Sequence, residues 1–250
     1  MKRSTLAASL AAVLLLGFAL SFAQAPELKT IKLNEPNKTR GLPVMQAFAL
    51  RASVREWSDK DLSLQDLSDL MWAANGVNRP DGRRTAPSAM NAQDVDIYVF
   101  LKDGGYKYDA ASHSLLPIVA GDYRLAVTPP RGGPGAKPPA KPGEKPEAKP
   151  EMPPPAAKPE VKPGPPPTPA PVLLILVTDT GKFRMGEPDM KFRFGALDVG
   201  IVSENIGVFC AGTGLATRPR AGMDTAKIKE LLKLTETQVP LLNHPVGYPK

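Results

Sequence analysis

The stretch 67–100, LSDLMWAANGVNRPDGRRTAPSAMNAQDVDIYVF, joins a helix pattern to a strand pattern through a polar loop. A capping-box pair, Ser63 and Asp66, precedes apolar residues at helical spacing, and Asn75-Gly76 ends this helix. Residues 95–101 are rich in branched and aromatic side chains, which is typical of a strand. The loop 84–93 between them contains small residues, a proline and two carboxamides, with no obvious acid, base or nucleophile. Such a loop suits contact with a flat polar ligand better than bond breaking by side chains.

The remaining patterns predict a mixed α+β domain. Residues 44–51 and the apolar run 196–216 are predicted helices, and Asp224 caps another helix. Asp103-Gly104-Gly105 turns the first strand into a hairpin, VLLILV at 172–177 predicts a buried strand, and the chain ends in an extended run. Neither half of the chain has enough elements to fold alone. We therefore expect one α+β domain over residues 26–250.

The first 25 residues have the pattern of a secretory signal. Lys2 and Arg3 precede an apolar run, and Ala23-Gln24-Ala25 is a small-x-small cleavage site. The alternative is a membrane anchor, but the apolar run is short for a span. We expect export to the periplasm or the extracellular space, with cleavage after Ala25.

Residues 129–171 form a proline- and lysine-rich insert. This segment holds 18 of the 29 prolines and almost no large apolar residues, so burial cannot offset the entropy of ordering it. It predicts a disordered, partly polyproline II spacer that interrupts the domain. A tolerated insertion and an attachment to the cell wall or another partner are both open readings.

Charge and cysteine usage argue against several functional classes. The formal net charge is +7, but the signal and the insert carry most of it, and the remaining body lacks a phosphate-binding stripe. We therefore predict no nucleic-acid partner. Cys210, the single cysteine, lies in an apolar run and is expected to be a core thiol. His113 and His244 have no metal-ligand spacing, so we predict no metal and place both at the surface or in a hairpin.

Three stretches could instead hold a ligand. Arg51, Ser53 and Arg55 alternate, so an extended backbone would point two guanidinium groups and a hydroxyl the same way. In the loop 84–93, Pro87 rigidifies a turn, and small residues precede two amide side chains. In the third stretch, 214–224, glycines and Pro219 separate two helices and expose backbone N–H groups.

These stretches resemble segments of the nitroreductase family, in particular its compact SagB/thiazole-oxidase-type dehydrogenase branch. The stretch 67–100 is similar to the family's flavin-binding segment, and RASVR at 51–55 to its Arg-x-Ser-x-Arg element. GLATRPRAGMD at 214–224 and LLNHPVGYPK at 241–250 resemble its later helix-loop and closing strand. The four motifs occur in the family's order and cover both halves of the chain outside the insert.

The resemblance implies a sandwich with an antiparallel-rich sheet flanked by helices, and an intertwined homodimer that binds FMN at the subunit interface. The implied cofactor-binding residues come from the three stretches. They are Arg51, Ser53 and Arg55 at the phosphate and polar edge, Pro87, Ser88 and Ala89 along the ring, Asn91 and Gln93 at the ribityl chain or ring edge, and Pro219, Arg220, Ala221 and Gly222 near N5.

The resemblance also implies the activity, an FMN-dependent oxidoreductase with a ping-pong two-electron mechanism. The flavin N5 carries the chemistry, no side chain is catalytic, and the acceptor is a small molecule. NAD(P)H is the usual donor, but an exported protein points to a quinone or membrane-linked donor. Two departures, Ala221 where many relatives are acidic and the short end at Lys250, leave an alternative open. In that alternative the protein is a flavin-binding or wall-associated scaffold of the same fold without turnover.

Overall fold

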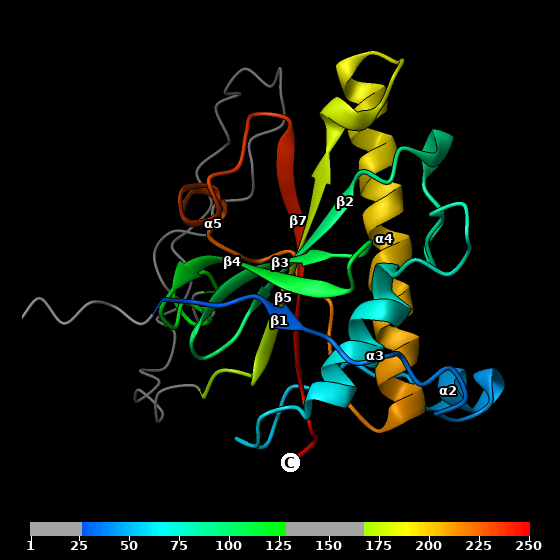
Figure 1. Ribbon diagram of the computed structural model, residues 1–250, viewed down its shortest axis with the longest axis vertical. Helices are drawn as coiled ribbons and strands as arrows, with labels where there is room; N and C mark the ends of the chain where they lie inside the picture. Colours follow the sequence, from blue (N-terminus) through cyan, green and yellow to red (C-terminus); the bar gives the residue numbers. More distant parts are fainter. Residues whose placement is uncertain (1–26, 129–167) are drawn as a thin grey trace, which may run out of the picture.

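A computed structural model describes residues 27–128 and 168–250. They form a seven-stranded sheet in the order β1-β4-β3-β2-β5-β7-β6, in which every neighbouring pair is antiparallel. Helices cover both faces of the sheet (Figure 1). This confirms the predicted α+β sandwich. The strands are β1 (Ile31–Lys32), β2 (Val95–Phe100), β3 (Gly104–Asp109), β4 (Ser114–Ala120), β5 (Val172–Asp179), β6 (Ala216–Thr217) and β7 (Gln238–Gly247).

The centre of the sheet is apolar on both faces because helices pack on each side. Every residue of β2 is buried, and all of β5 except Asp179 is buried as well. Along β2, Ile97 and Val99 join the core beneath α3 (Leu64–Asn75) and α4 (Pro188–Thr213), while Tyr98 and Phe100 join a second core. Unbroken apolar runs are expected for strands that are covered on both sides.

The second face is covered by α5 (Thr225–Leu232), which lies opposite α3 and α4 in Figure 1. Asp224 caps α5 as predicted, because its side chain accepts from the Lys227 N–H. Next to this core, the buried Arg124 donates to the carbonyls of Ala170 and Pro171, both at 3.0 Å. The last residues of the predicted insert are therefore packed against the domain. Residues 129–167, and the predicted signal at 1–25, lie outside the described residues.

Helix α3 begins and ends where the sequence predicts. Ser63 accepts from the Asp66 N–H at 3.0 Å, and Gly76 follows the last residue. Helix α2 (Val44–Leu50) also matches its prediction to within one residue.

Helix α4 differs from its predicted range of 196–216. It begins at Pro188, because a proline suits the first turn and the polar residues there hid it from an apolar pattern. It ends at Thr213, because Gly214 is left-handed with φ 75°, and Ala216 belongs to β6. Among the described helices, α4 is the one whose length and mean hydropathy of 1.4 would suit a membrane span. Its buried residues pack on the sheet, and Cys210 among them is 1% exposed, as predicted for a core thiol.

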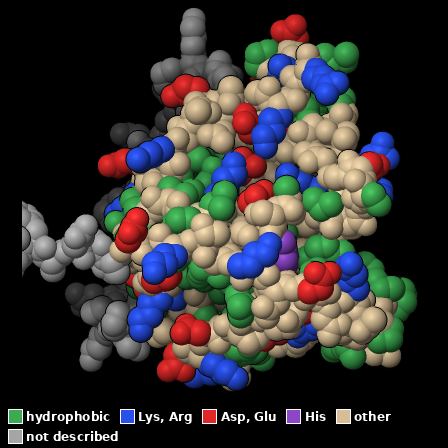
Figure 2. All heavy atoms as spheres, viewed as in Figure 1, with side chains coloured by type: hydrophobic (Ala, Val, Ile, Leu, Met, Phe, Trp, Pro, Cys, Tyr) green, Lys and Arg blue, Asp and Glu red, His purple; other side chains and the backbone are tan. Residues whose placement is uncertain are grey.

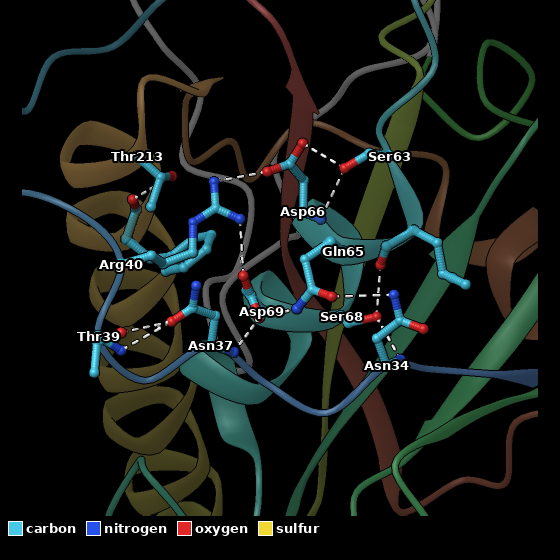
Figure 3. Close-up of polar contacts among 12 residues, drawn as sticks. Asn34, Asn37, Thr39, Arg40, Ser63, Gln65, Asp66, Ser68, Asp69 and Thr213 are labelled. Carbon is cyan, nitrogen blue, oxygen red and sulfur yellow. Dashed lines mark hydrogen bonds and ion pairs between the residues drawn. The ribbon is translucent and has the colours of Figure 1, made fainter.

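A polar network fastens residues 34–40 to α3 (Figure 3). Arg40 forms ion pairs with Asp66 at 2.7 Å and Asp69 at 2.8 Å. Burial opposes ionisation of Asp66, but hydrogen bonds from Ser63, Tyr248 and Arg40 outweigh it and lower the pKa of this carboxyl. Tyr248 follows β7, so the network joins residues 34–40 and the segment after β7 to the same helix.

Candidate functional site

The predicted Arg-x-Ser-x-Arg segment leaves α2 and runs beside β6. Val54 donates its N–H to the Thr217 carbonyl at 3.0 Å, and the Trp57 indole donates to the Ala216 carbonyl at 3.3 Å. Val54 is half-buried, whereas Arg51, Ser53 and Arg55 are exposed. The alternation predicted from the sequence therefore leaves all three polar side chains in solvent.

The segment after β6 brings two more arginines to the same place. The Arg218 guanidinium lies 5.8 Å from the centre of the Trp57 ring. Burial, and then the neighbouring charge of Arg218, lowers the pKa of Arg220 to about 10. We call Arg51, Arg55, Arg218 and Arg220 the arginine corner. In the described chain, Arg51, Arg55 and Arg220 form no ion pair with a carboxylate. Concentrated positive charge of this kind is suited to an anionic ligand.

Asn243 of β7 holds the loop that carries Arg220. Its side chain is fully buried and accepts from Arg220 Nε at 2.8 Å. Its amide nitrogen donates to the carbonyls of Arg220 and Gly222 at 3.0 and 3.1 Å. These bonds fix the backbone of 220–222, while Pro219, Ala221 and Gly222 remain exposed. The exposed backbone predicted for this loop is therefore present and rigidly supported.

His244, the next residue, is fully buried and is neither a surface nor a hairpin residue, which corrects the sequence prediction. Its Nδ1 lies 3.2 Å from Thr217 Oγ1 and its Nε2 lies 2.8 Å from Ser203 Oγ. Thr217 donates its only proton to the Pro245 carbonyl, so Nδ1 is the donor and Ser203 donates to Nε2. Burial, and then the charge of Arg220, lowers the pKa of His244 to about 4, which agrees with this neutral ring. His113 lies in the turn between β3 and β4, which agrees with its expected place in a hairpin, although this is not the hairpin predicted at 103–105.

The remaining predicted stretch, the loop 84–93, is strained over residues 87–93, which we call the 87–93 loop. Met90, Asn91 and Gln93 have φ values of 56°, 51° and 48°, a left-handed conformation that non-glycine residues rarely adopt. Four hydrogen bonds that involve a side chain hold it. The Ala89 N–H donates to Asp198, the Gln93 N–H to Ser88 Oγ, the Gln93 amide to the Gly82 carbonyl, and Lys182 to the Gln93 carbonyl. Strain that the surroundings maintain is characteristic of functional loops.

The structure brings two of the three predicted stretches together and places the third apart. Val54 and Thr217 join the Arg-x-Ser-x-Arg segment to the arginine-bearing loop, whereas the 87–93 loop meets α4 at Asp198. Arg51 lies by Gly207 of the same helix, 3.9 Å from the position of a Cβ there. Residues 198 and 207 are separated by about 13 Å along a helix that rises 1.5 Å per residue. The two parts therefore contact α4 at different levels, the loop in its N-terminal half and Arg51 near its C-terminus, which we call its loop end and its arginine end.

The model of the nitroreductase family matches residues 49–248, a range that contains all three stretches. The chain belongs to the nitroreductase family. This confirms the family resemblance, and the chain is accordingly a nitroreductase-family oxidoreductase. The more specific SagB-type branch stays a prediction.

Two relatives show how far the similarity extends. MJ1384 of Methanocaldococcus jannaschii, which is named as a nitroreductase, is 27% identical over 232 residues, 90% of this chain and 94% of that protein. A crystal structure described as a nitroreductase from Ralstonia eutropha JMP134 has a TM-score of 0.70 at 30% identity and covers 89% of this chain and 90% of that one. A chain of the E. coli microcin synthetase McbBCD complex, 17% identical with a TM-score of 0.57, shares the fold over 96% of this chain and 82% of that one.

Several residues that support the candidate site were not predicted to do so from the sequence. Asn243 and His244 lie in β7, and their partners are 21 to 41 residues away in the chain. Asp198 did leave a signal, since it is a lone carboxylate inside the apolar run 196–202. The described residues contain no group of three or more His, Cys, Asp or Glu side chains able to hold a metal.

Proposed function

We propose that this nitroreductase-family protein binds FMN and uses it for two-electron transfer to a small acceptor, with two half-reactions in turn. The observation that carries the proposal is the arginine corner, where Arg51, Arg55 and Arg220 form no ion pair with a carboxylate of the described residues and lie beside a rigidly held backbone loop. FMN brings a phosphate and a flat polar ring, which match these two features. Arg51, Ser53 and Arg55 would hold the phosphate and the polar edge of the ring.

When bound, FMN would supply hydride-level chemistry at N5. The protein positions the cofactor and keeps the site polar where the ring needs hydrogen bonds. Pro219, Arg220, Ala221 and Gly222 would present backbone groups to the ring, because Asn243 fixes that loop. Pro87, Ser88 and Ala89 would line the ring, and Asn91 and Gln93 would reach its edge or the ribityl chain.

We further propose a homodimer, because the outer surfaces of α2 and α4 are apolar and exposed. On α2, Met45 is 74% and Phe48 51% exposed, and on α4 Leu197 is 65% exposed. Figure 2 shows hydrophobic side chains gathered at the corner of the molecule that α2 forms. An apolar patch across two packed helices is typical of a protein interface. A second copy would also bring its 87–93 loop toward the arginine corner, from which the loop of the same chain is separated.

For the electron donor we propose a quinone or a membrane-linked reductase, with NAD(P)H as the alternative. The support is the predicted signal at 1–25, which implies export away from the cytoplasmic nicotinamide pool. Rapid NADH turnover by the purified protein would contradict the quinone or membrane-linked donor. The second candidate function is a flavin-binding scaffold without turnover, which Ala221 favours because many relatives are acidic there.

The first test is flavin retention by the chain without residues 1–25. We expect flavin absorbance bands after loading with FMN and desalting, with FMN released on denaturation. Replacing Arg55 with Ala should raise the FMN Kd about ten- to a hundredfold, the effect of losing a charge-assisted hydrogen bond. Arg83→Ala is the matched control, because this exposed arginine pairs with Asp81 away from the arginine corner. A colourless protein that leaves FMN fluorescence unquenched would contradict the proposal.

A further inference from the structure

Two buried carboxyl groups meet beneath the 87–93 loop. Asp94, just before β2, is fully buried, and Asp198 of α4 is 4% exposed. Asp94 Oδ2 accepts from Thr178 Oγ1 of β5 at 2.6 Å, and Asp198 Oδ2 accepts from the Ala89 N–H at 2.8 Å. The pair thus connects two strands, one helix and the strained loop.

No cation of the described chain neutralises this pair. Lys182 contacts the loop, but it donates to the Gln93 carbonyl and to Asp96. Lys107 also pairs with Asp96. Arg84 donates to the Val95 carbonyl at 3.4 Å. Asp179, the acidic residue at the end of β5, accepts from the Gly181 N–H. Two unpaired buried carboxylates would repel each other strongly, so at least one is expected to be protonated.

The hydrogen bonds indicate where that proton lies. Asp94 Oδ1 is buried and receives no N–H or O–H donor from the described residues. A proton on Asp198 Oδ1 would supply the missing donor, while Oδ2 still accepts from Ala89. Burial, together with the hydrogen bond and charge of Asp94, raises the pKa of Asp198 to about 7 against the opposing effect of the Ala89 N–H. The proton is therefore exchangeable near neutral pH.

Close packing keeps the pair in place. One turn before Asp198, Gly195 lies against Thr178, and a Cβ there would come within 2.9 Å of the Thr178 Cβ and closer still to its hydroxyl. This approach brings α4 onto β5 beside the Asp94–Thr178 bond. Among the described residues, Asp198 is the one side chain of α4 that forms a hydrogen bond with the 87–93 loop.

We propose that Asp94 and Asp198, sharing one proton, position the 87–93 loop for the flavin. The pair is a positioning device, because both carboxyl groups are buried and Asp198 acts on the loop through the Ala89 N–H. Loss of the shared proton places two negative charges in contact, separates the carboxyl groups, and releases the strained loop from α4. This inference rests on the proposed FMN function and adds a pH dependence to it.

The test compares FMN affinity from pH 6 to 9 in the wild type and in Asp198→Asn. Asparagine keeps an oxygen for the Ala89 N–H and replaces the shared proton by a fixed N–H donor toward Asp94. The wild-type Kd, measured by quenching of flavin fluorescence, should rise about five- to tenfold relative to Asp198→Asn as pH increases through 7, the scale of one lost hydrogen bond. Titration of the FMN phosphate affects both proteins and cancels in their ratio.

Two further variants complete the design. Asp198→Ala should bind FMN weakly at every pH, and Asp189→Asn, which neutralises an exposed acid in the first turn of α4, should follow the wild type. Parallel Kd profiles for wild type and Asp198→Asn would overturn the proposal. Absence of FMN binding by every variant at every pH would overturn the proposed function, and the positioning role with it. In that event the melting temperature of the ligand-free proteins against pH still decides whether the pair shares a proton.

Discussion

The two ends of α4 support the candidate site in opposite ways. Near Gly207 the arginine corner holds positive charge at the surface, and the buried Asn243 and His244 stabilise the loop behind it through neutral hydrogen bonds. Near Asp198 the partly exposed 87–93 loop is strained and uncharged, and the charge lies in the buried carboxyl pair. The comparison indicates that the arginine corner would attract an anionic ligand by its charge, and that an 87–93 loop would contact the ligand by its shape.

The largest expected change in the free energy of unfolding comes from adding a methyl group to a glycine of α4 at the loop end. Gly195→Ala should lower the free energy of unfolding by about 3 kcal/mol or more, because the added methyl group meets the Thr178 side chain and neither helix nor strand can move freely. Thermal melting with circular dichroism measures the change.

The matched control is Gly207→Ala, at the arginine end of the same helix. A Cβ there meets side-chain atoms of Arg51 and Glu204 at an ordinary distance, 3.9 Å at the nearest, so the variant should gain up to about 1 kcal/mol from helix propensity. Equal melting temperatures for the two variants would show that the close approach of α4 to β5 does not constrain the loop end.

A smaller effect is expected at the arginine end from Asn243→Ala. This change removes three hydrogen bonds and leaves the carbonyl groups of Arg220 and Gly222 without this donor, at a cost of about 2–3 kcal/mol. It should also weaken FMN binding, because the loop is no longer fixed. The measurements are urea denaturation and flavin fluorescence. Asn34→Ala, an exposed site with one side-chain bond to Gln65, should change stability by less than about 0.5 kcal/mol. A loss of stability in Asn243→Ala with unchanged FMN affinity would separate this residue from the site.

The sequence predicts the features of the fold and of the candidate site that depend on local patterns. The Ser63 cap, the glycine after α3, the alternation at 51–55 and the turn residues at 87–93 all act within a few residues of each other. The family match carries the fold, because the motifs occur in a fixed order along the chain.

Features that depend on distant partners were not predictable. Asn243 and His244 look like ordinary polar residues of an extended run until Arg220 and Ser203 are placed beside them. Strand β4 was missed because Pro117 disfavours a strand pattern. It is tolerated because β1 pairs only with Ser114 and Leu115, so no neighbour needs the missing N–H on that side. Strands β1 and β6 have two residues each, too few for any periodic signal.

The last predicted effects concern the pH dependence of stability and have opposite signs at the two ends. The raised pKa of Asp198 stabilises the fold at low pH, and this contribution is lost as pH rises from about 4 to about 7. The lowered pKa of His244 works the other way, because the unfolded chain takes up the proton first, so stability is lost as pH falls from about 6.5 to about 4. In the wild type the two slopes overlap and partly cancel.

Single variants should separate these slopes. In Asp198→Asn the free energy of unfolding should rise more steeply with pH between 4 and 6.5 than in the wild type, because the opposing contribution of Asp198 is removed. In His244→Gln it should rise less steeply than in the wild type, because the contribution of His244 is removed. Urea denaturation at half-unit steps of pH measures the slopes, and the two changes of slope should add in the double variant, since the two sites share no hydrogen bond. Changes of slope with the same sign in both single variants would contradict the assignment of one proton to each end of α4. Asp198 contacts the 87–93 loop and His244 does not. Only Asp198→Asn is therefore expected to alter the pH dependence of FMN binding as well.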